Sequence, residues 1–261
     1  MRVVFPADYF KSSQPDDVFA DQAKAFADAG FTVSVWDESA RKLKPTPVVG
    51  ETVIYRGWMM TPEHYAEFCQ QVIESQAIPL TSPEQYVAAH HLPNWYPLIS
   101  DLTPETVCFT ELGNLQAELE NLGWNGFFVK DFVKSLKTSL GSRLEHANAI
   151  RVLMAEMEKF RGQIEGGICV RQLEEFKPET ERRYFVLLGA PYAADGGSVP
   201  DLVRRVAERI HLPFYSVDII QRGDKVWRVV EIGDGQVSDL VGWTVDSFVE
   251  LWRALAVPAM S

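Results

Sequence analysis

Short apolar runs alternate with helical repeats of apolar residues over the first hundred positions of the chain. The run at residues 2–5 is β-branched and aromatic, and residues 16–30 that follow place apolar side chains at a helical spacing and end at a glycine. Residues 31–36 and 52–57 have the pattern of further strands, and residues 61–76 have that of a helix. Strands that alternate with helices in this way predict a βαβ-type parallel sheet.

The pattern changes after a proline-rich segment at residues 91–106. Beyond it, strand-like runs outnumber helical ones and follow one another as in hairpins, which predicts antiparallel pairing and an α+β arrangement. The expected strands are 125–133, 166–176, 181–189, 213–222 and 225–233, and the expected helices are 142–160, 198–210 and 244–256. The sequence therefore predicts an α/β domain over 1–100 and a second, mixed or antiparallel region over 101–261.

Composition and charge are those of a globular chain. The 261 residues are 46% hydrophobic and 23% charged, and no stretch approaches the ~20 apolar residues of a membrane span. A net charge of −11 argues against a protein that wraps nucleic acid or docks on anionic lipid, since both need clustered basic residues. Cys69, Cys108 and Cys169 are odd in number and widely spaced, so we expect reduced core cysteines and a cytoplasmic location.

Three carboxylates in the last fifty residues form the first candidate site. Asp218 lies inside an apolar strand run, Glu231 ends another, and Asp234 follows a glycine in an expected turn. At the ends of two neighbouring antiparallel strands they can converge, and carboxylate oxygens suit Mg²⁺ held with waters and a substrate phosphate. The alternative is a polar hairpin without metal, because Asp and Gly form turns. However, a carboxylate inside an apolar run is costly without a partner.

A basic, hydroxyl-rich stretch follows the strand expected at 125–133. Lys130 would point off the sheet into a solvent-filled cleft, and Lys134 begins a run of donors that extends to Ser142. Lysine meets phosphate oxygens as a point charge, and Ser, Thr and Gly amides can close over a triphosphate. The alternative is a solvated loop with scattered lysines. The chain lacks the common motifs of other enzyme classes, namely the phosphate loop, the dinucleotide-binding fingerprint, the GxSxG elbow, HExxH and CxxC.

The third candidate surrounds a proline turn between two expected strands. Residues 174–176 (EEF) precede the turn, and Glu181, Arg182 and Arg183 follow it. Alternation sends the two arginines to opposite faces, so one of them shares the face of the carboxylates. Arginine can grip a carboxylate or phosphate with two hydrogen bonds, and Glu181 can accept from ribose hydroxyls. The alternative is a ladder of surface salt bridges, each of which contributes little.

Taken in chain order, these features resemble the ATP-grasp superfamily. The strings VVEIGDGQVSDL (229–240) and IYRGWMM (54–60) are most similar to the clade named for two arginines and a lysine, and NWYP and LTPET extend the likeness through the middle loop. Members of that clade are viewed as amide-bond-forming ligases. The resemblance implies an ATP-grasp fold, with an N-terminal βαβ pre-ATP-grasp subdomain followed by a mixed or antiparallel ATP-binding region.

The resemblance also implies roles for individual residues. ATP phosphates would be held by Lys130 and Lys134, the adenine by Glu174, Glu175 and Phe176, and the ribose by Glu181. Phosphates or the acceptor carboxylate would be steadied by Arg183, with Arg171 or Arg56. Mg²⁺ would be bound by Asp218 and Glu231. Gly233 stands where the family usually has Asn, so Asp234 either supplies the missing oxygen or the metal is held more weakly.

The implied activity is that of an ATP-dependent carboxylate–amine ligase. ATP would phosphorylate a carboxylate to an acylphosphate, and an amine would then displace the phosphate, leaving ADP. ATP and Mg²⁺ are the expected cofactors, and small-molecule or peptide carboxylates and amines the expected substrates, with no nucleic acid or membrane partner. A homodimer is one open option. Two alternatives remain: an ATP-binding sensor or partner module without ligase activity, which Gly233 keeps open, and a phosphotransferase.

Overall fold

The computed structural model describes residues 1–133, 142–161, 166–194 and 196–256. It divides into two units, which we call unit 1 and unit 2. Unit 1 consists of Met1–Val87, Arg182–Val217 and Gly233–Ser261, and unit 2 of Ala88–Glu181 and Asp218–Ile232. This differs from the predicted division at residue 100, because three strands of the second half contribute residues to both units. No helix in the described parts of the chain is long and apolar enough to cross a membrane.

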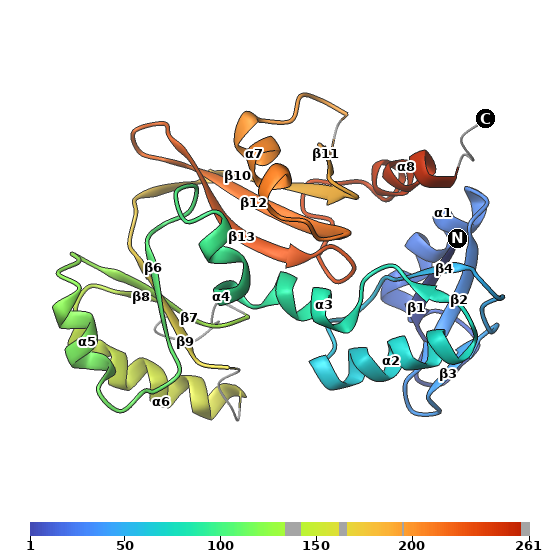
Figure 1. Ribbon diagram of the computed structural model, residues 1–261, viewed down its shortest axis with the longest axis horizontal. Helices are drawn as coiled ribbons and strands as arrows, with labels where there is room; N and C mark the ends of the chain where they lie inside the picture. Colours follow the sequence, from blue (N-terminus) through green and yellow to red (C-terminus); the bar gives the residue numbers. More distant parts are fainter. Residues whose placement is uncertain (134–141, 162–165, 195, 257–261) are drawn as a thin grey trace. The chain divides into compact units, whose positions relative to one another are not determined.

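Unit 1 contains a five-stranded sheet in the order β3-β2-β1-β4-β5 (Figure 1). Its strands are β1 (Arg2–Pro6), β2 (Thr32–Asp37), β3 (Lys42–Lys44), β4 (Thr52–Tyr55) and β5 (Ile78–Pro79). β1 pairs in parallel with β2 and β4, and β4 pairs in parallel with β5, as the alternating pattern predicted. The short β3 is antiparallel to β2 and was not predicted.

Helices cover both faces of this sheet because alternate residues of β1 point to opposite sides. Val3 and Phe5 pack with α1 (Ala20–Asp28) and α8 (Val245–Ala256). Val4, between them, packs with α2 (Pro62–Glu74). α2 begins where the sequence predicted, since the Thr61 hydroxyl accepts a hydrogen bond from the His64 amide and Pro62 occupies the first turn.

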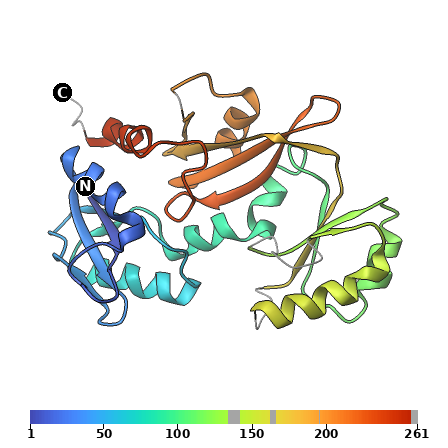
Figure 2. The ribbon, with the colours of Figure 1, turned by 180° about the vertical axis from the view of Figure 1, so that it is seen from behind.

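Unit 2 contains a four-stranded sheet in the order β6-β9-β7-β8. Its strands are β6 (Thr106–Phe109), β7 (Phe127–Asp131), β8 (Arg143–Leu144) and β9 (Ile168–Gln172), and its two longer helices are α5 (Leu115–Asn121) and α6 (Ile150–Arg161). All the pairings are antiparallel. The helices lie together against one face (Figure 2), where Leu119 and Ile150 pack on Val129 and Val170.

The helix predicted over 142–160 begins eight residues later than expected. Arg143 and Leu144 instead form β8, where they pair with Phe128 and Phe127 of β7. The apolar stripe that predicted the helix starts at Ile150, which is fully buried and begins α6. The segment before the stripe carried no helical periodicity, so pairing with β7 decides its structure.

The third sheet has the order β11-β10-β12-β13. Its strands are β10 (Phe176–Leu187), β11 (Ala190–Tyr192), β12 (Phe214–Arg222) and β13 (Trp227–Asp234). β10, β12 and β13 each supply residues to both units. β13 continues through Asp234, so the turn expected at that residue comes later. The remaining helices are α3 (Pro83–His90), α4 (Leu92–Trp95) and α7 (Asp201–Arg209).

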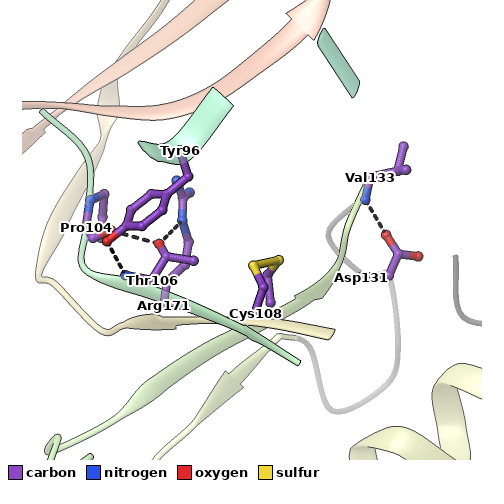
Figure 3. Close-up of a disulfide and its surroundings, with 8 residues drawn as sticks. Tyr96, Pro104, Thr106, Cys108, Asp131, Val133 and Arg171 are labelled. Carbon is purple, nitrogen blue, oxygen red and sulfur yellow. Dashed lines mark hydrogen bonds between the residues drawn. A yellow bond between two sulfur atoms is a disulfide. The ribbon is translucent and has the colours of Figure 1, made fainter. Parts of the chain in front are cut away.

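Cys108 and Cys169 form a disulfide, which contradicts the expectation of three reduced cysteines. They lie directly opposite each other on β6 and β9, with their Cα atoms 4.1 Å apart (Figure 3). Their separation of 61 residues hid the pairing from the sequence, because only the register of the two strands brings them together. Cys69 is free and buried, as predicted.

Candidate functional site

A pocket in unit 2 brings together six of the residues predicted to form a site. It encloses about 270 Å³, and every residue that lines it belongs to unit 2. The predicted residues among them are Lys130, Arg171, Glu174, Phe176, Glu181 and Glu231. They come from four strands or their immediate flanks, so the pocket depends on bringing together segments far apart in the sequence.

Strand alternation explains how β7 supplies both an apolar and a cationic group. Phe128 and Lys130 share one face of β7 and line the pocket. Phe127 and Val129 point the other way, into the core with α5 and α6. Besides Phe128, apolar groups in the wall come from Leu173, Phe176, Ile220 and Val230. Flat rings and branched side chains of this kind suit the faces of a purine base.

Lys130 is buried and paired with a carboxylate. Its Nζ lies 3.3 Å from Glu231 Oε1 on β13, while the Lys130 side chain is 3% exposed and that of Glu231 is 41% exposed. The prediction that Lys130 reaches into a solvent-filled cleft is therefore wrong. The lysine lies inside the largely buried strand β7, and its charge is compensated by a carboxylate on the rim of the same pocket.

Arg171 is held in a fixed orientation by groups that the sequence analysis did not assign to the site. Its guanidinium donates to Thr103 Oγ1 at 2.7 Å, to Thr106 Oγ1 at 3.3 Å and to the Val230 carbonyl. Figure 3 shows Arg171 beside Thr106. Burial lowers the pKa of Arg171 to about 10, and the nearby charge of Glu231 opposes that shift. The guanidinium thus stays cationic at neutral pH.

Glu174 is clamped by two arginines. Its Oε1 lies 3.1 Å from Arg228 Nη2, and its Oε2 lies 3.2 Å from Arg222 Nη1. Neither arginine was singled out in the sequence, since each stands in an ordinary strand pattern. Glu175 points outward with an 83% exposed side chain, and its carbonyl accepts from the Gly223 amide. Glu175 is not among the residues that line the pocket.

The three predicted metal carboxylates do not meet as one group. Asp218 is 4% exposed on β12 and shares a strand face with Ile220, which lines the pocket. Asp234 belongs to unit 1, is fully buried, and accepts from the Gln236 amide at 2.8 Å. Burial raises the pKa of Asp234 to about 7. Within the described ranges, no three His, Cys, Asp or Glu side chains are grouped as for a metal ion.

Arg56 and Arg183, two of the predicted catalytic arginines, belong to unit 1. Arg56 is 3% exposed, and its Nη1 donates to the carbonyls of Gly235, Gln236 and Ser238. Burial lowers the pKa of Arg56 to about 10. These bonds fix the segment after β13. Arg183 Nη1 donates to the carbonyl of Asp239 in the same segment at 2.9 Å. The predicted Lys134 lies outside the described residues.

The donor set of the pocket fits a nucleotide with a divalent cation. Lys130 and Arg171 are fixed cations of the kind that meet phosphate oxygens. Glu231 lines the pocket and Asp218 lies on the same strand face as its lining residue Ile220; both are carboxylates, whose hard oxygens Mg²⁺ prefers in company with substrate phosphates. The apolar wall and Glu181 complete a surface for a base and its sugar.

A comparison with family models identifies the family of the chain. Residues 120–255, just over half of the chain, match the family model described as ATP-grasp domain, R2K clade family 3. The chain belongs to this ATP-grasp family. The match confirms the resemblance and the fold inferred from the sequence, and with them the predicted class of ATP-dependent ligase.

Solved structures share the ATP-grasp fold along nearly the whole chain. D-cycloserine synthetase DcsG superposes with a TM-score of 0.67 at 14% identity, covering 98% of this chain and 100% of its own. A RimK domain protein from Sphaerobacter thermophilus gives 0.63 at 15%, with 96% and 98% covered. The ligase PsnB, solved with a minimal precursor, Mg and ADP, gives 0.60 at 14%, with 97% of both chains covered. No curated protein matches the sequence of the chain.

Proposed function

We propose that this ATP-grasp protein is an ADP-forming ligase that activates a carboxylate as an acylphosphate for attack by an amine. The observation that carries the proposal is the pocket of unit 2, which combines the buried cations Lys130 and Arg171, three carboxylates and an apolar wall. Phosphoryl transfer depends on positioning and charge neutralisation rather than on a side-chain nucleophile. That requirement agrees with a pocket that contains no Ser, Cys or His among its lining residues in the described part of the chain.

The proposal gives each predicted nucleotide-binding residue a task. Lys130 and Arg171 bind phosphate oxygens, with Lys134 as a further phosphate ligand. Phe176 and the segment at Glu174 and Glu175 bind the adenine, and Glu181 binds the ribose. Thr103 and Thr106 hold the Arg171 guanidinium in place.

Asp218 and Glu231 bind Mg²⁺, which neutralises phosphate charge when it is present. Glu231 would then exchange its contact with Lys130 for the metal, and Lys130 would exchange Glu231 for a phosphate. Both charges are therefore compensated before and after the nucleotide binds. Asp234, buried in unit 1 against Gln236, serves to hold the segment after β13 rather than the metal.

Arg183 steadies the phosphates or the acceptor carboxylate in this proposal. Its side chain is half-buried, and its Nη1 donates to the Asp239 carbonyl in the segment after β13. Arg56 acts indirectly, since its Nη1 donates to three backbone carbonyls. We assign it the role of holding the segment after β13.

Structural neighbours give support for the substrate class. PsnB was solved with precursor peptide PsnA2 and AMPPNP, and macrocyclase MdnC from Microcystis aeruginosa with precursor peptide MdnA, whereas DcsG is a D-cycloserine synthetase. We therefore propose peptide or small-molecule carboxylates and amines as substrates, without a nucleic acid or membrane partner. We propose a cytoplasmic location.

ADP release with Mg²⁺ across a panel of amino acids and short peptides tests the proposal. Release that depends on both a carboxylate and an amine supports the ligase. Tight ATP binding without turnover on any member would favour the alternative, a nucleotide-binding module that acts as a sensor or partner. Release that needs the carboxylate alone, with a phosphorylated product, would indicate a phosphotransferase.

A further inference from the structure

A second pocket lies in unit 1 at the carboxyl ends of parallel strands. It encloses about 840 Å³, and Pro6, Asp37 and Tyr55, the last residues of β1, β2 and β4, help to line it. In open parallel sheets, ligands bind outside this edge, where the connections leave a strand in opposite directions. β1 is such a strand, with β2 on one side and β4 on the other. All the lining residues belong to unit 1.

The charge of this pocket is negative. Its carboxylates are those of Asp8, Asp16, Asp37 and Glu38. His64, the one basic side chain among the described lining residues, lies 2.7 Å from Glu38, and Lys44 pairs with Asp37 from outside the lining. Asp8 and Asp16 form no ion pair with any described residue. A cationic ligand would therefore meet carboxylates that the chain itself has not neutralised.

An exposed aromatic residue stands beside these carboxylates in a fixed orientation. Trp58 is 51% exposed, yet its Nε1 donates to Asp16 Oδ2 at 3.2 Å and its ring packs edge-on against Phe19 at 5.0 Å. Tyr9 and Met59 are also exposed and line the same pocket. An aromatic face held next to a carboxylate favours a cation with an apolar stem, through cation–π attraction and apolar contact.

Trp36 forms part of the buried wall of this pocket. It is 2% exposed, and its indole nitrogen has no hydrogen-bond partner among the described residues and almost no accessible surface. A ligand in the pocket would not reach that nitrogen, so Trp36 contributes apolar wall and no polar contact.

We propose that this pocket binds a peptide segment in which a basic residue stands beside an apolar one. The basic side chain lies between Asp8 and Asp16, and the apolar side chain packs on Trp58. This proposal extends the proposed function. It rests on that function in one respect, which is that the bound peptide is taken to be a substrate of the ligase. A free amine shares the cationic group but lacks the apolar side chains.

Calorimetric titration of the full chain without ATP tests this proposal. The probes are capped Lys-Leu-Lys-Leu, capped Glu-Leu-Glu-Leu and spermidine. We expect the basic peptide to bind at least tenfold tighter than either other probe. Asp16→Asn keeps an acceptor for Val18, and Asp8→Asn keeps one for Phe10 and Lys11. Each change should weaken binding about threefold. Asp28→Asn, an exposed carboxylate on α1 outside the pocket, is the matched control and should change nothing.

Variants of Trp58 distinguish recognition of the apolar side chain from a general attraction between opposite charges. Trp58→Ala should weaken the basic peptide about fivefold, and Trp58→Phe should restore most of that loss. Equal binding of the two peptides, spermidine binding as tight as the basic peptide, or an Asp28→Asn loss equal to that of Asp16→Asn would overturn the proposal. ATP binding is measured in a parallel titration. If the protein binds the basic peptide but not ATP, the proposed ligase function is rejected. If it binds ATP but not the basic peptide, the assignment of the unit 1 pocket is rejected.

Discussion

Lys130 Nζ and Glu231 Oε1 lie 3.3 Å apart across the pocket of unit 2, and the lysine is the buried partner of the two. This pair joins the residue expected to hold phosphate with the residue expected to hold the metal. Without nucleotide, each charge satisfies the other. The pair therefore links the stability of unit 2 to the residues that would bind ATP.

Glu231→Gln should destabilise the protein without ligand, because it leaves the buried Lys130 charge without its carboxylate. We expect a loss of about 1–2 kcal/mol in the free energy of unfolding, reduced from the value for a fully buried pair by the exposure of Glu231. Turnover should fall more than ATP affinity. Urea unfolding of both proteins checks this, and equal midpoints would contradict it.

Lys130→Met should leave stability unchanged or slightly raised. Methionine fills a similar volume, removes a buried charge, and leaves Glu231 on the rim in contact with water. Lys130→Ala should instead cost about 1–3 kcal/mol through lost packing. Thermal unfolding of both variants separates the two outcomes. A methionine variant as unstable as the alanine variant would show that the ion pair itself stabilises the fold.

Reduction of the Cys108–Cys169 disulfide should lower the free energy of unfolding by about 2–4 kcal/mol, because the bond closes a loop of 61 residues. Urea unfolding with and without reductant measures the difference. Cys69→Ala should keep the full effect, since Cys69 is free. A double variant, Cys108→Ala with Cys169→Ala, should show none. An unchanged wild type under reductant would contradict a disulfide at this position.

The raised pKa of Asp234 predicts that the free energy of unfolding falls as the pH rises from about 4 to about 7. Burial raises its pKa in the folded protein to about 7, whereas in the unfolded chain it titrates near the ordinary value. Over that interval the folded state keeps a proton that the unfolded state has released, so its advantage at low pH is lost as the pH rises. Asp234→Asn should flatten this slope. Unfolding free energies at pH 4, 5.5 and 7.5 measure it, and an identical slope in both proteins would exclude Asp234 as its source.

The sequence predicted the features of this protein that depend on local pattern. Parallel pairing of β1 with β2 and β4 followed from strand–helix alternation, and the positions of Lys130 and Phe176 followed from runs of strand residues. The Cys108–Cys169 bond and the clamp of Glu174 by Arg228 could not be predicted, because each joins residues more than fifty positions apart.

The error at Lys130 has the same origin. A strand pattern gives the face on which a residue lies but not what covers that face, and here Glu231, 101 residues later, supplies the partner. The place of Asp234 was missed in the same way. The amide and side chain of Gln236 bind this carboxylate in unit 1, whereas spacing along the chain suggested a group with Asp218 and Glu231.

ATP-dependent stabilisation of wild type and Lys130→Met is the measurement that tests the central claim most directly. With Mg²⁺ and ATP at a hundredfold excess over Kd, the wild type should gain about 2.7 kcal/mol in the free energy of unfolding. Lys130→Met should lose most of that gain, and Lys42→Met, an exposed lysine on β3, should keep it. No gain in the wild type, or an equal gain in Lys130→Met, would contradict ATP binding in the pocket of unit 2.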